Sequence, residues 1–211
     1  NQLGKHVTVL EAADRVLARV AGNDLADFFT AEHRRRGVDI RTATTVAALE
    51  TTGDAATAVV TDAGERVATD LVIVGIGIRP ETAPLTTAGA AGDDGVDVDE
   101  FCRTSLPHVY AIGDGARHAN RFADGLRLRI ESVQNAADQA KTAAASIVGE
   151  PTPYRALPWF WSDQYDLKLK TAGLNIGHDA TVVRGDPTAR QFSVLYLRDG
   201  RLIAADCVNA I

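Results

Sequence analysis

Cysteine is scarce in this sequence, which has only two among its 211 residues. Cys102 and Cys207 lie far apart and form no CxxC motif. A closely spaced cysteine pair for redox exchange or zinc binding is therefore excluded within these residues. The simplest interpretation is a reduced, cytoplasmic protein in which both thiols are packed.

Excess positive charge and long apolar segments are lacking as well. The formal net charge is −6, which gives no electrostatic case for binding nucleic acid. The longest apolar run, residues 71–78, is too short to cross a bilayer, and no signal peptide is visible. We therefore expect neither nucleic acid nor membrane as a partner, in a chain whose 45% hydrophobic residues are typical of globular proteins.

The clearest local signal lies at residues 104–115. The apolar run from Val109 to Ile112 is too short for a helix and predicts a buried strand that ends at Gly113-Asp114-Gly115. In an open α/β sheet, ligands bind at the carboxyl edge of the strands. Asp114 is therefore a candidate ligand-binding residue beside a flexible glycine backbone, although a surface turn is the alternative interpretation.

A helix is predicted to follow, beginning near Glu131 or Ser132. Its N-terminus would offer unpaired N–H groups and partial positive charge to an electron-rich ligand. A helix that serves only for packing is the alternative. The small or apolar side chains that indicate the helix are Val133, Ala136, Ala137, Ala140, Ala144 and Ile147.

The first residues predict a strand, Val7 to Leu10, that runs into the carboxylate of Glu11. In dinucleotide-binding units, an acidic residue about 20 positions after a glycine-rich loop binds the adenosine ribose. Glu11 fits that acidic position, and an ordinary solvated carboxylate is the alternative. The glycine-rich loop would precede residue 1, so we expect the chain to be a C-terminal part of a longer protein.

The next segments predict a helix and several strands. Asn23 is predicted to cap a helix with Leu25, Phe28 and Phe29 on one face, and Gly37 would follow its last turn. Residues 46–50 and 58–61 predict short strands separated by the turn Gly53-Asp54.

Residues 70–80 predict a buried strand that runs into a turn containing Gly75 and Gly77. Glycines at a strand end let a ligand approach the backbone closely. A purely structural turn explains the same two glycines equally well. The segment is therefore a candidate ligand-binding turn and no more.

The C-terminal part is rich in aromatic residues and strand signals. Four of the aromatic residues fall between Trp159 and Tyr165, which indicates either a core cluster or a binding site. Two apolar runs flank Asp199-Gly200, a good hairpin signal that predicts an antiparallel sheet. A local group of basic residues precedes this region and is either a solvated loop or a docking patch for an acidic redox partner; its members are Arg117, His118, Arg121, Arg127 and Arg129.

Three of these stretches together resemble a known family. Residues 104–114 resemble the second flavin-binding motif of flavoproteins with two dinucleotide-binding domains. Residues 129–139, with Arg-Ile-Glu-Ser, Asn-Ala and Gln-Ala, resemble the helix that follows it in FAD-dependent NADH:ferredoxin reductases. Residues 158–164, Pro-Trp-Phe-Trp-Ser-Asp-Gln, resemble a signature of the reductases that serve bacterial hydroxylases and dioxygenases, of the rubredoxin, putidaredoxin and biphenyl-dioxygenase types.

The resemblance implies an α/β fold, α+β overall, that is part of a glutathione-reductase-like flavoprotein. Residues 1–83 would be the C-terminal half of an NADH-binding Rossmann-like domain. Residues 84–150 would be the returning segment of the FAD-binding domain. Residues 151–211 would form a small, incomplete, antiparallel α+β C-terminal domain.

The resemblance also implies an oxidoreductase of the EC 1.18.1 type, with FAD and NAD as cofactors. It would pass a hydride from NADH to FAD and then single electrons to a [2Fe-2S] ferredoxin that serves an oxygenase. Gly113 and Asp114 would bind the flavin, with Asp114 on the ribitol hydroxyls. Backbone N–H groups near Ser132 and Val133 would face the flavin carbonyl side, and Glu131 would lie near the junction with the nicotinamide.

The remaining implied contacts concern the ring and NADH. Trp161 would contact the flavin ring, and Gly75 and Gly77 would face the nicotinamide end. Glu11 would select NADH, because a carboxylate repels the 2′-phosphate of NADPH. The resemblance implies no catalytic side chain and no metal site.

Three alternatives remain open at this point. The chain could belong to another NADH-dependent flavin reductase of the superfamily, such as a monodehydroascorbate reductase or a disulfide reductase. It could also be a non-catalytic interaction fragment whose C-terminal sheet forms a homodimer. We expect the 211 residues alone to bind FAD and NADH weakly and to show no turnover.

Overall fold

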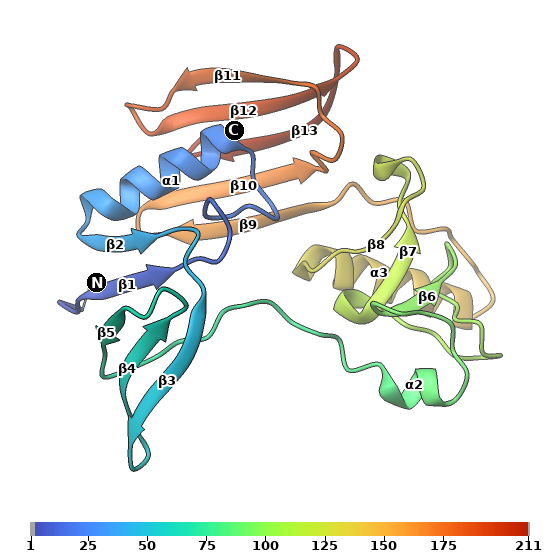
Figure 1. The fold of residues 1–211 in the computed structure, drawn as a ribbon. Helices are drawn as coiled ribbons and strands as arrows, with labels where there is room; N and C mark the ends of the chain where they lie inside the picture. Colours follow the sequence, from blue (N-terminus) through green and yellow to red (C-terminus); the bar gives the residue numbers. More distant parts are fainter. Residues whose placement is uncertain (1–2, 211) are drawn as a thin grey trace. The chain divides into compact units, whose positions relative to one another are not determined.

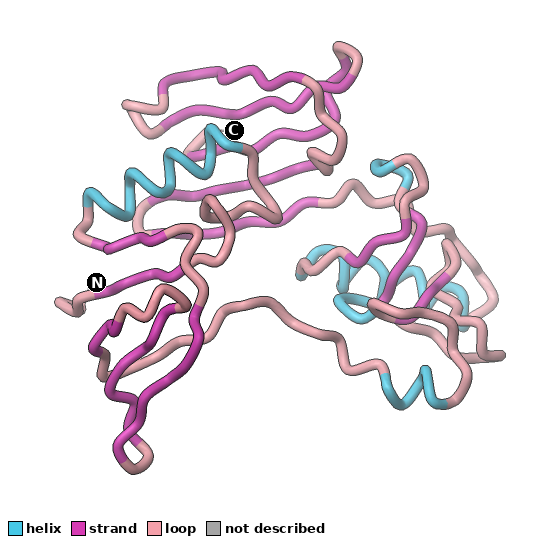
Figure 2. Tube along the Cα trace, in the orientation of Figure 1, coloured by secondary structure: helices cyan, strands magenta, loops and turns pink. Residues whose placement is uncertain are grey.

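The structure is a computed structural model that describes residues 3–210. These residues form two compact units, the first ending at Ile76 and the second beginning at Gly77. The described residues form four small sheets, two in each unit (Figures 1 and 2). Among them, no helix combines the length and the apolar character that a bilayer crossing requires.

The first unit begins with a parallel pair of strands. β1 (Val7–Leu10) pairs with β2 (Val38–Arg41), and α1 (Asn23–Arg35) lies between them in the chain. Parallel neighbours need such a crossover. The predicted apolar face of α1 is confirmed by the burial of Leu25 and Phe29. The predicted cap is wrong by one residue, because the extended Gly22 takes the N-cap position and Asn23 is already helical.

The first unit continues as an antiparallel meander. β3 (Val46–Thr52), β4 (Ala55–Thr61) and β5 (Arg66–Ala68) are neighbours in that order. The predicted turn at Gly53-Asp54 is confirmed, and Gly53 has a φ of +59°, a conformation that glycine adopts without steric cost.

The buried strand predicted at residues 70–80 is wrong. This segment has no regular secondary structure, and the side chains of Leu71, Ile73 and Ile76 are 75%, 86% and 91% exposed. A strand forms only where a neighbour completes its hydrogen-bond ladder. None of the described strands pairs with these residues, so their apolar composition alone does not produce a strand.

The strand predicted at residues 109–112 is also wrong as a regular element. Tyr110 makes a single antiparallel bridge to Arg103, and Ile112 is 42% exposed. The physical reason is the same, because no described strand continues this ladder.

The second unit starts with the short α2 (Ala83–Thr87) and a mixed three-stranded sheet. β6 (Val96–Val98) runs parallel to β7 (Ala116–Ala119), which pairs antiparallel with β8 (Arg127–Arg129). The turn η1 (Gly113–Gly115) leads directly into β7, and η2 (Arg121–Ala123) follows it. The longer α3 (Val133–Ile147) packs against η1.

The C-terminal part of the second unit is a five-stranded antiparallel sheet in the order β11-β12-β13-β10-β9. Its hairpin at Asp199-Gly200 is confirmed. Leu167, Leu169, Phe192 and Val194 are buried and alternate with exposed or half-buried residues along their strands, as expected for a sheet with one buried face. The strand bounds are β9 (Trp159–Gln164), β10 (Leu167–Gly173), β11 (Ala180–Asp186), β12 (Gln191–Arg198) and β13 (Arg201–Val208).

One carboxyl group of this sheet is buried. Asp206 on β13 is 4% exposed and accepts a hydrogen bond of 2.5 Å from the hydroxyl of Tyr196 on β12. Burial raises the pKa of Asp206 to about 6, because a carboxylate loses hydration in the interior.

Asp206 should make the stability of the protein fall as the pH rises. Between about pH 4 and pH 6 the unfolded chain loses this proton while the folded protein keeps it, which costs about 2–3 kcal/mol of unfolding free energy above pH 6. Asp206→Asn cannot titrate at this position. In urea unfolding, the unfolding free energy of the variant relative to that of the wild type should therefore be higher at pH 7 than at pH 4 by this amount. Asp163→Asn, on the exposed face of β9, is the control. Parallel pH profiles of wild type and Asp206→Asn would contradict the prediction.

Candidate functional site

The candidate site is built around the turn η1. Gly113 is buried and has a φ of +69°, and a Cβ atom there would lie 3.3 Å from the Cβ of Ala136 on α3. Glycine therefore permits both the left-handed backbone and the close approach of the turn to the helix. The side chain of Asp114, the next residue, is exposed.

The N-terminus of α3 lies against this turn. Ser132 is the N-cap, and its Oγ accepts a hydrogen bond of 3.1 Å from the backbone N–H of Asn135. The prediction that a helix begins near Ser132 is thus confirmed. The N–H groups of Val133 and Gln134 precede the first intrahelical hydrogen bond, which Ala136 donates to Ser132. They leave an electropositive helix end on the helix that packs against the turn carrying Asp114.

Arg129, which the sequence analysis did not assign to the site, connects Asp114 with Glu131. The guanidinium of Arg129 donates to the backbone carbonyl of Asp114 at 2.9 Å and to the carboxylate of Glu131 at 2.8 Å. It also pairs with Asp94 at 3.2 Å, and its side chain is only 8% exposed. The sequence did contain an indication of this role, because Arg129 is the first residue of the Arg-Ile-Glu-Ser motif.

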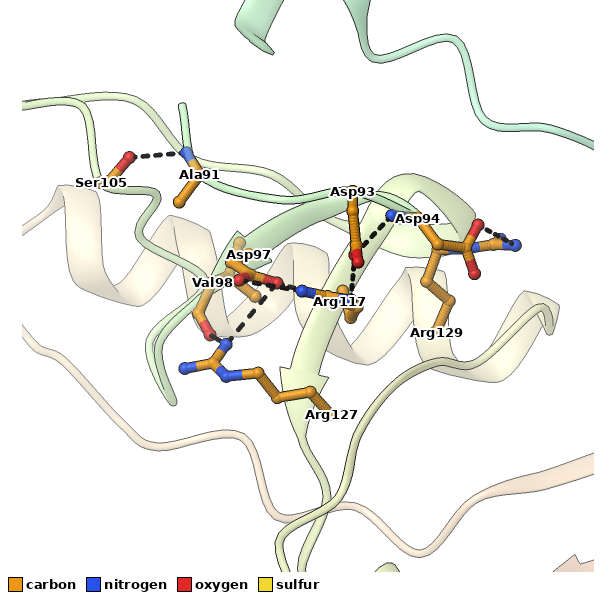
Figure 3. A network of polar contacts seen from close by, with 9 residues as sticks. All are labelled: Ala91, Asp93, Asp94, Asp97, Val98, Ser105, Arg117, Arg127 and Arg129. Atoms are coloured by element: carbon orange, nitrogen blue, oxygen red, sulfur yellow. Dashed lines mark hydrogen bonds and ion pairs between the residues drawn. The ribbon is translucent and has the colours of Figure 1, made fainter. Parts of the chain in front are cut away.

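Three members of the basic cluster singled out in the sequence, Arg117, Arg127 and Arg129, belong to a network of ion pairs with acidic side chains (Figure 3). Arg117 pairs with Asp93 and, at 2.6 Å, with Asp97. Arg127 lies 3.8 Å from Asp97. The hydrogen bond from Arg117 lowers the pKa of Asp97. Because acidic residues compensate most of the positive charge, these arginines do not form the free positive patch that docking of an acidic partner would need.

The predicted aromatic residue Trp161 lies on the exposed side of β9. It is 47% exposed and stacks at a tilt against Trp159, with ring centroids 5.6 Å apart. The backbone N–H of Trp159 donates to Oε1 of Gln134 at 3.3 Å. This contact ties the start of β9 to the first turn of α3, so the aromatic pair and the helix N-terminus belong to one region of the second unit.

Glu11 lies in the first unit, immediately after β1. One of its carboxylate oxygens accepts a hydrogen bond of 2.9 Å from the N–H of Ala13, and its backbone bonds to Arg41 and Thr44. The side chain is half-buried at the carboxyl end of a parallel strand, the edge where open α/β sheets bind ligands.

The two glycines predicted to face NADH, Gly75 and Gly77, lie in the exposed segment without regular structure. Gly77 has a φ of +96°. The structure thus gathers Gly113, Asp114, Glu131, Ser132 and Val133 at one place, and it leaves Glu11 and Gly75 in the other unit. Among residues 3–210, no group of three or more His, Cys, Asp and Glu side chains is arranged to hold a metal ion.

Comparison with known families accounts for most of the chain. Residues 1–140 match the family described as pyridine nucleotide-disulphide oxidoreductase. Residues 159–211 match the family described as reductase C-terminal.

Curated relatives and solved structures agree with these matches. A 5,5'-dehydrodivanillate O-demethylase ferredoxin reductase subunit from Sphingobium sp. is 62% identical over 99% of this chain and 51% of its own length. Putidaredoxin reductase from Pseudomonas putida is 44% identical over 97% of this chain and 49% of its own length. The chain therefore spans about half the length of the curated relatives it matches.

Among solved structures, the ferredoxin reductase for the CYP199A2 system from Rhodopseudomonas palustris superimposes with a TM-score of 0.95 at 40% identity, over 99% of this chain and 52% of that one. The covalent complex of putidaredoxin reductase with putidaredoxin gives a TM-score of 0.94 at 42% identity, over 99% of this chain and 50% of the matched one.

Proposed function

Because the chain belongs to the pyridine nucleotide-disulphide oxidoreductase family, we propose that the protein containing it is an FAD-dependent NADH:ferredoxin reductase of an oxygenase system. The observation that carries the proposal is the exposed carboxylate of Asp114 in a turn whose Gly113 packs against the first turn of α3. Relatives named as ferredoxin reductases, 44–62% identical over nearly all of the chain, support the same function.

The donor and acceptor groups at η1 and α3 fit a flavin. Asp114 offers carboxylate oxygens to the ribitol hydroxyls, and the N–H groups of Val133 and Gln134 suit the electron-rich carbonyl side of the ring. Arg129 holds the turn in place through the carbonyl of Asp114 and orients Glu131 at the same time. When bound, FAD supplies the redox chemistry, which accepts a hydride and releases single electrons.

Other residues of the chain would select the reductant and shield the ring. Glu11 disfavours a phosphorylated ribose, and its position is held by the N–H of Ala13. Trp161 offers an exposed aromatic face that excludes water from a flat ring system. Gly75 and Gly77 present backbone without side chains to the nicotinamide end.

The partner in this proposal is a [2Fe-2S] ferredoxin, and the compartment is the cytoplasm. A related reductase has been solved as a covalent complex with putidaredoxin, which supports a small protein as electron acceptor. The proposal also includes a homodimer formed through the C-terminal sheet, whose edge strand β11 is exposed along its whole length.

Two measurements on the full-length protein that carries this chain test the proposal. Its absorption spectrum should contain a flavin at about one per chain, and NADH should drive reduction of a [2Fe-2S] ferredoxin. A protein with flavin that reduces a small disulfide but no ferredoxin would instead be a disulfide reductase of the same superfamily. A protein without flavin would refute the proposal.

A further inference from the structure

A buried polar network lies behind the turn that carries Asp114. Its centre is Gln139, in the middle of α3 and 0% exposed. Oε1 of Gln139 accepts a hydrogen bond of 2.7 Å from the backbone N–H of Gly113 and lies 3.4 Å from Nδ2 of Asn135. Nε2 of Gln139 lies 3.3 Å from Nδ1 of His118 on β7. One side chain thus connects the turn, the helix and the sheet.

The orientation of this carboxamide follows from its neighbours. The N–H of Gly113 can only donate, so the oxygen of Gln139 must face it and the NH₂ group must face His118. Asn120 behaves in the same way, because its oxygen accepts from the N–H of Phe122 and its Nδ2 lies 3.2 Å from Nε2 of His118.

His118 is therefore contacted by an amide NH₂ group at both ring nitrogens. A protonated imidazole would present N–H groups to both, whereas the neutral ring keeps one acceptor nitrogen. Burial also lowers the pKa of His118, and Arg127 lowers it further. Both the geometry and the lowered pKa favour the neutral ring, which can accept a hydrogen bond from one of these two amides.

The rest of the network fixes the first turns of the helix. Nδ2 of Asn135 donates to the carbonyl of Ile130 at 2.9 Å, and Oδ1 of Asn135 accepts from the hydroxyl of Tyr154 at 2.8 Å. The start of α3 and the turn η1 are consequently connected by hydrogen bonds, because Gln139 contacts both Asn135 and Gly113.

We propose that Gln139 is a positioning residue that fixes the backbone of Gly113 and thereby aims the carboxylate of Asp114 at the flavin. The fixing of the Gly113 backbone by Gln139 rests on the structure alone. The aiming of Asp114 at the flavin rests on the proposed function. Gln139 is 0% exposed, so it has no surface to offer to a cofactor or substrate. It acts through one backbone N–H group, and Arg129 holds the same turn from the other side by the carbonyl of Asp114.

The test compares variants of the full-length protein by local hydrogen exchange and FAD titration. Gln139→Met keeps the straight side chain but removes both polar groups, so the Gly113 amide should exchange about tenfold faster and FAD should bind about tenfold more weakly. Gln139→Glu keeps an oxygen that faces Gly113 and, when protonated, an O–H that can face His118, so it should restore both values. Thr142→Val, at a buried position one turn further along α3, should change neither.

The possible outcomes distinguish the positioning of Gly113 by Gln139 from its consequence for FAD binding. Unchanged exchange at Gly113 in Gln139→Met, or an equal effect of Thr142→Val, would overturn the positioning role. Faster exchange with unchanged FAD affinity would overturn the link to the flavin. If the wild type binds no FAD, the proposed function fails while the exchange data still test the contact. The wild type alone must also protect the Gly113 amide well beyond its unfolded rate, so a rate near that of an unfolded chain would refute the proposal even if the variants do not fold.

Discussion

Replacement of Asp114 by alanine is expected to lower the FAD affinity of the full-length protein by about 100-fold. Asp114 is exposed in the turn that packs against α3, so its carboxylate can accept hydrogen bonds from sugar hydroxyls. Hydrogen bonds to a charged group contribute about 1.5–3 kcal/mol each, and a 100-fold loss of affinity equals about 2.7 kcal/mol, so the loss of one strong hydrogen bond of this kind would give the effect. FAD released on dilution, followed by its fluorescence, measures the change.

Two further variants make this experiment specific. Asp114→Asn keeps one acceptor oxygen and should lose less affinity than Asp114→Ala. Asp54→Ala removes an exposed aspartate that likewise follows a glycine in a turn, between β3 and β4, and should leave FAD binding unchanged. An affinity of Asp114→Ala within twofold of the wild type would remove Asp114 from the flavin site.

Elements with strong local chemistry were predictable from the sequence. Ser132 caps α3 because its hydroxyl can reach a backbone N–H three residues ahead. The hairpins at Gly53-Asp54 and Asp199-Gly200 form because these residues tolerate turn conformations. The predicted fold class and the resemblance to ferredoxin reductases are confirmed by the matched families and structures. The three-domain division stays a prediction.

Features that depend on distant residues were not predictable. Residues 71–78 have the composition of a buried strand, yet they are irregular and exposed because no described strand pairs with them. The role of Arg129 depends on Asp94, 35 positions away. The contact between Gln139 and Gly113 spans 26 positions. A single sequence shows the polar residues but not which of them meet.

Replacement of Glu11 by arginine is expected to reverse the coenzyme preference of the full-length protein. In the proposed function, the carboxylate of Glu11 at the end of β1 would bind the ribose hydroxyls of NADH and repel a 2′-phosphate. An arginine would remove the repulsion and could pair with the phosphate through its planar guanidinium. The ratio of kcat/KM for NADH to that for NADPH should fall by about 100-fold, since both the loss of one contact and the gain of another contribute.

Matched variants distinguish a specific role of Glu11 from a general change of charge or stability. Glu11→Gln removes the charge but keeps an oxygen for the N–H of Ala13, so it should give an intermediate preference. Asp62→Arg reverses an exposed charge in the turn after β4 of the same unit and should leave the preference unchanged. Because specificity is a ratio measured on the same enzyme sample, partial unfolding of a variant cancels from it. A preference for NADH that survives Glu11→Arg would therefore place the ribose-binding carboxylate elsewhere in the protein.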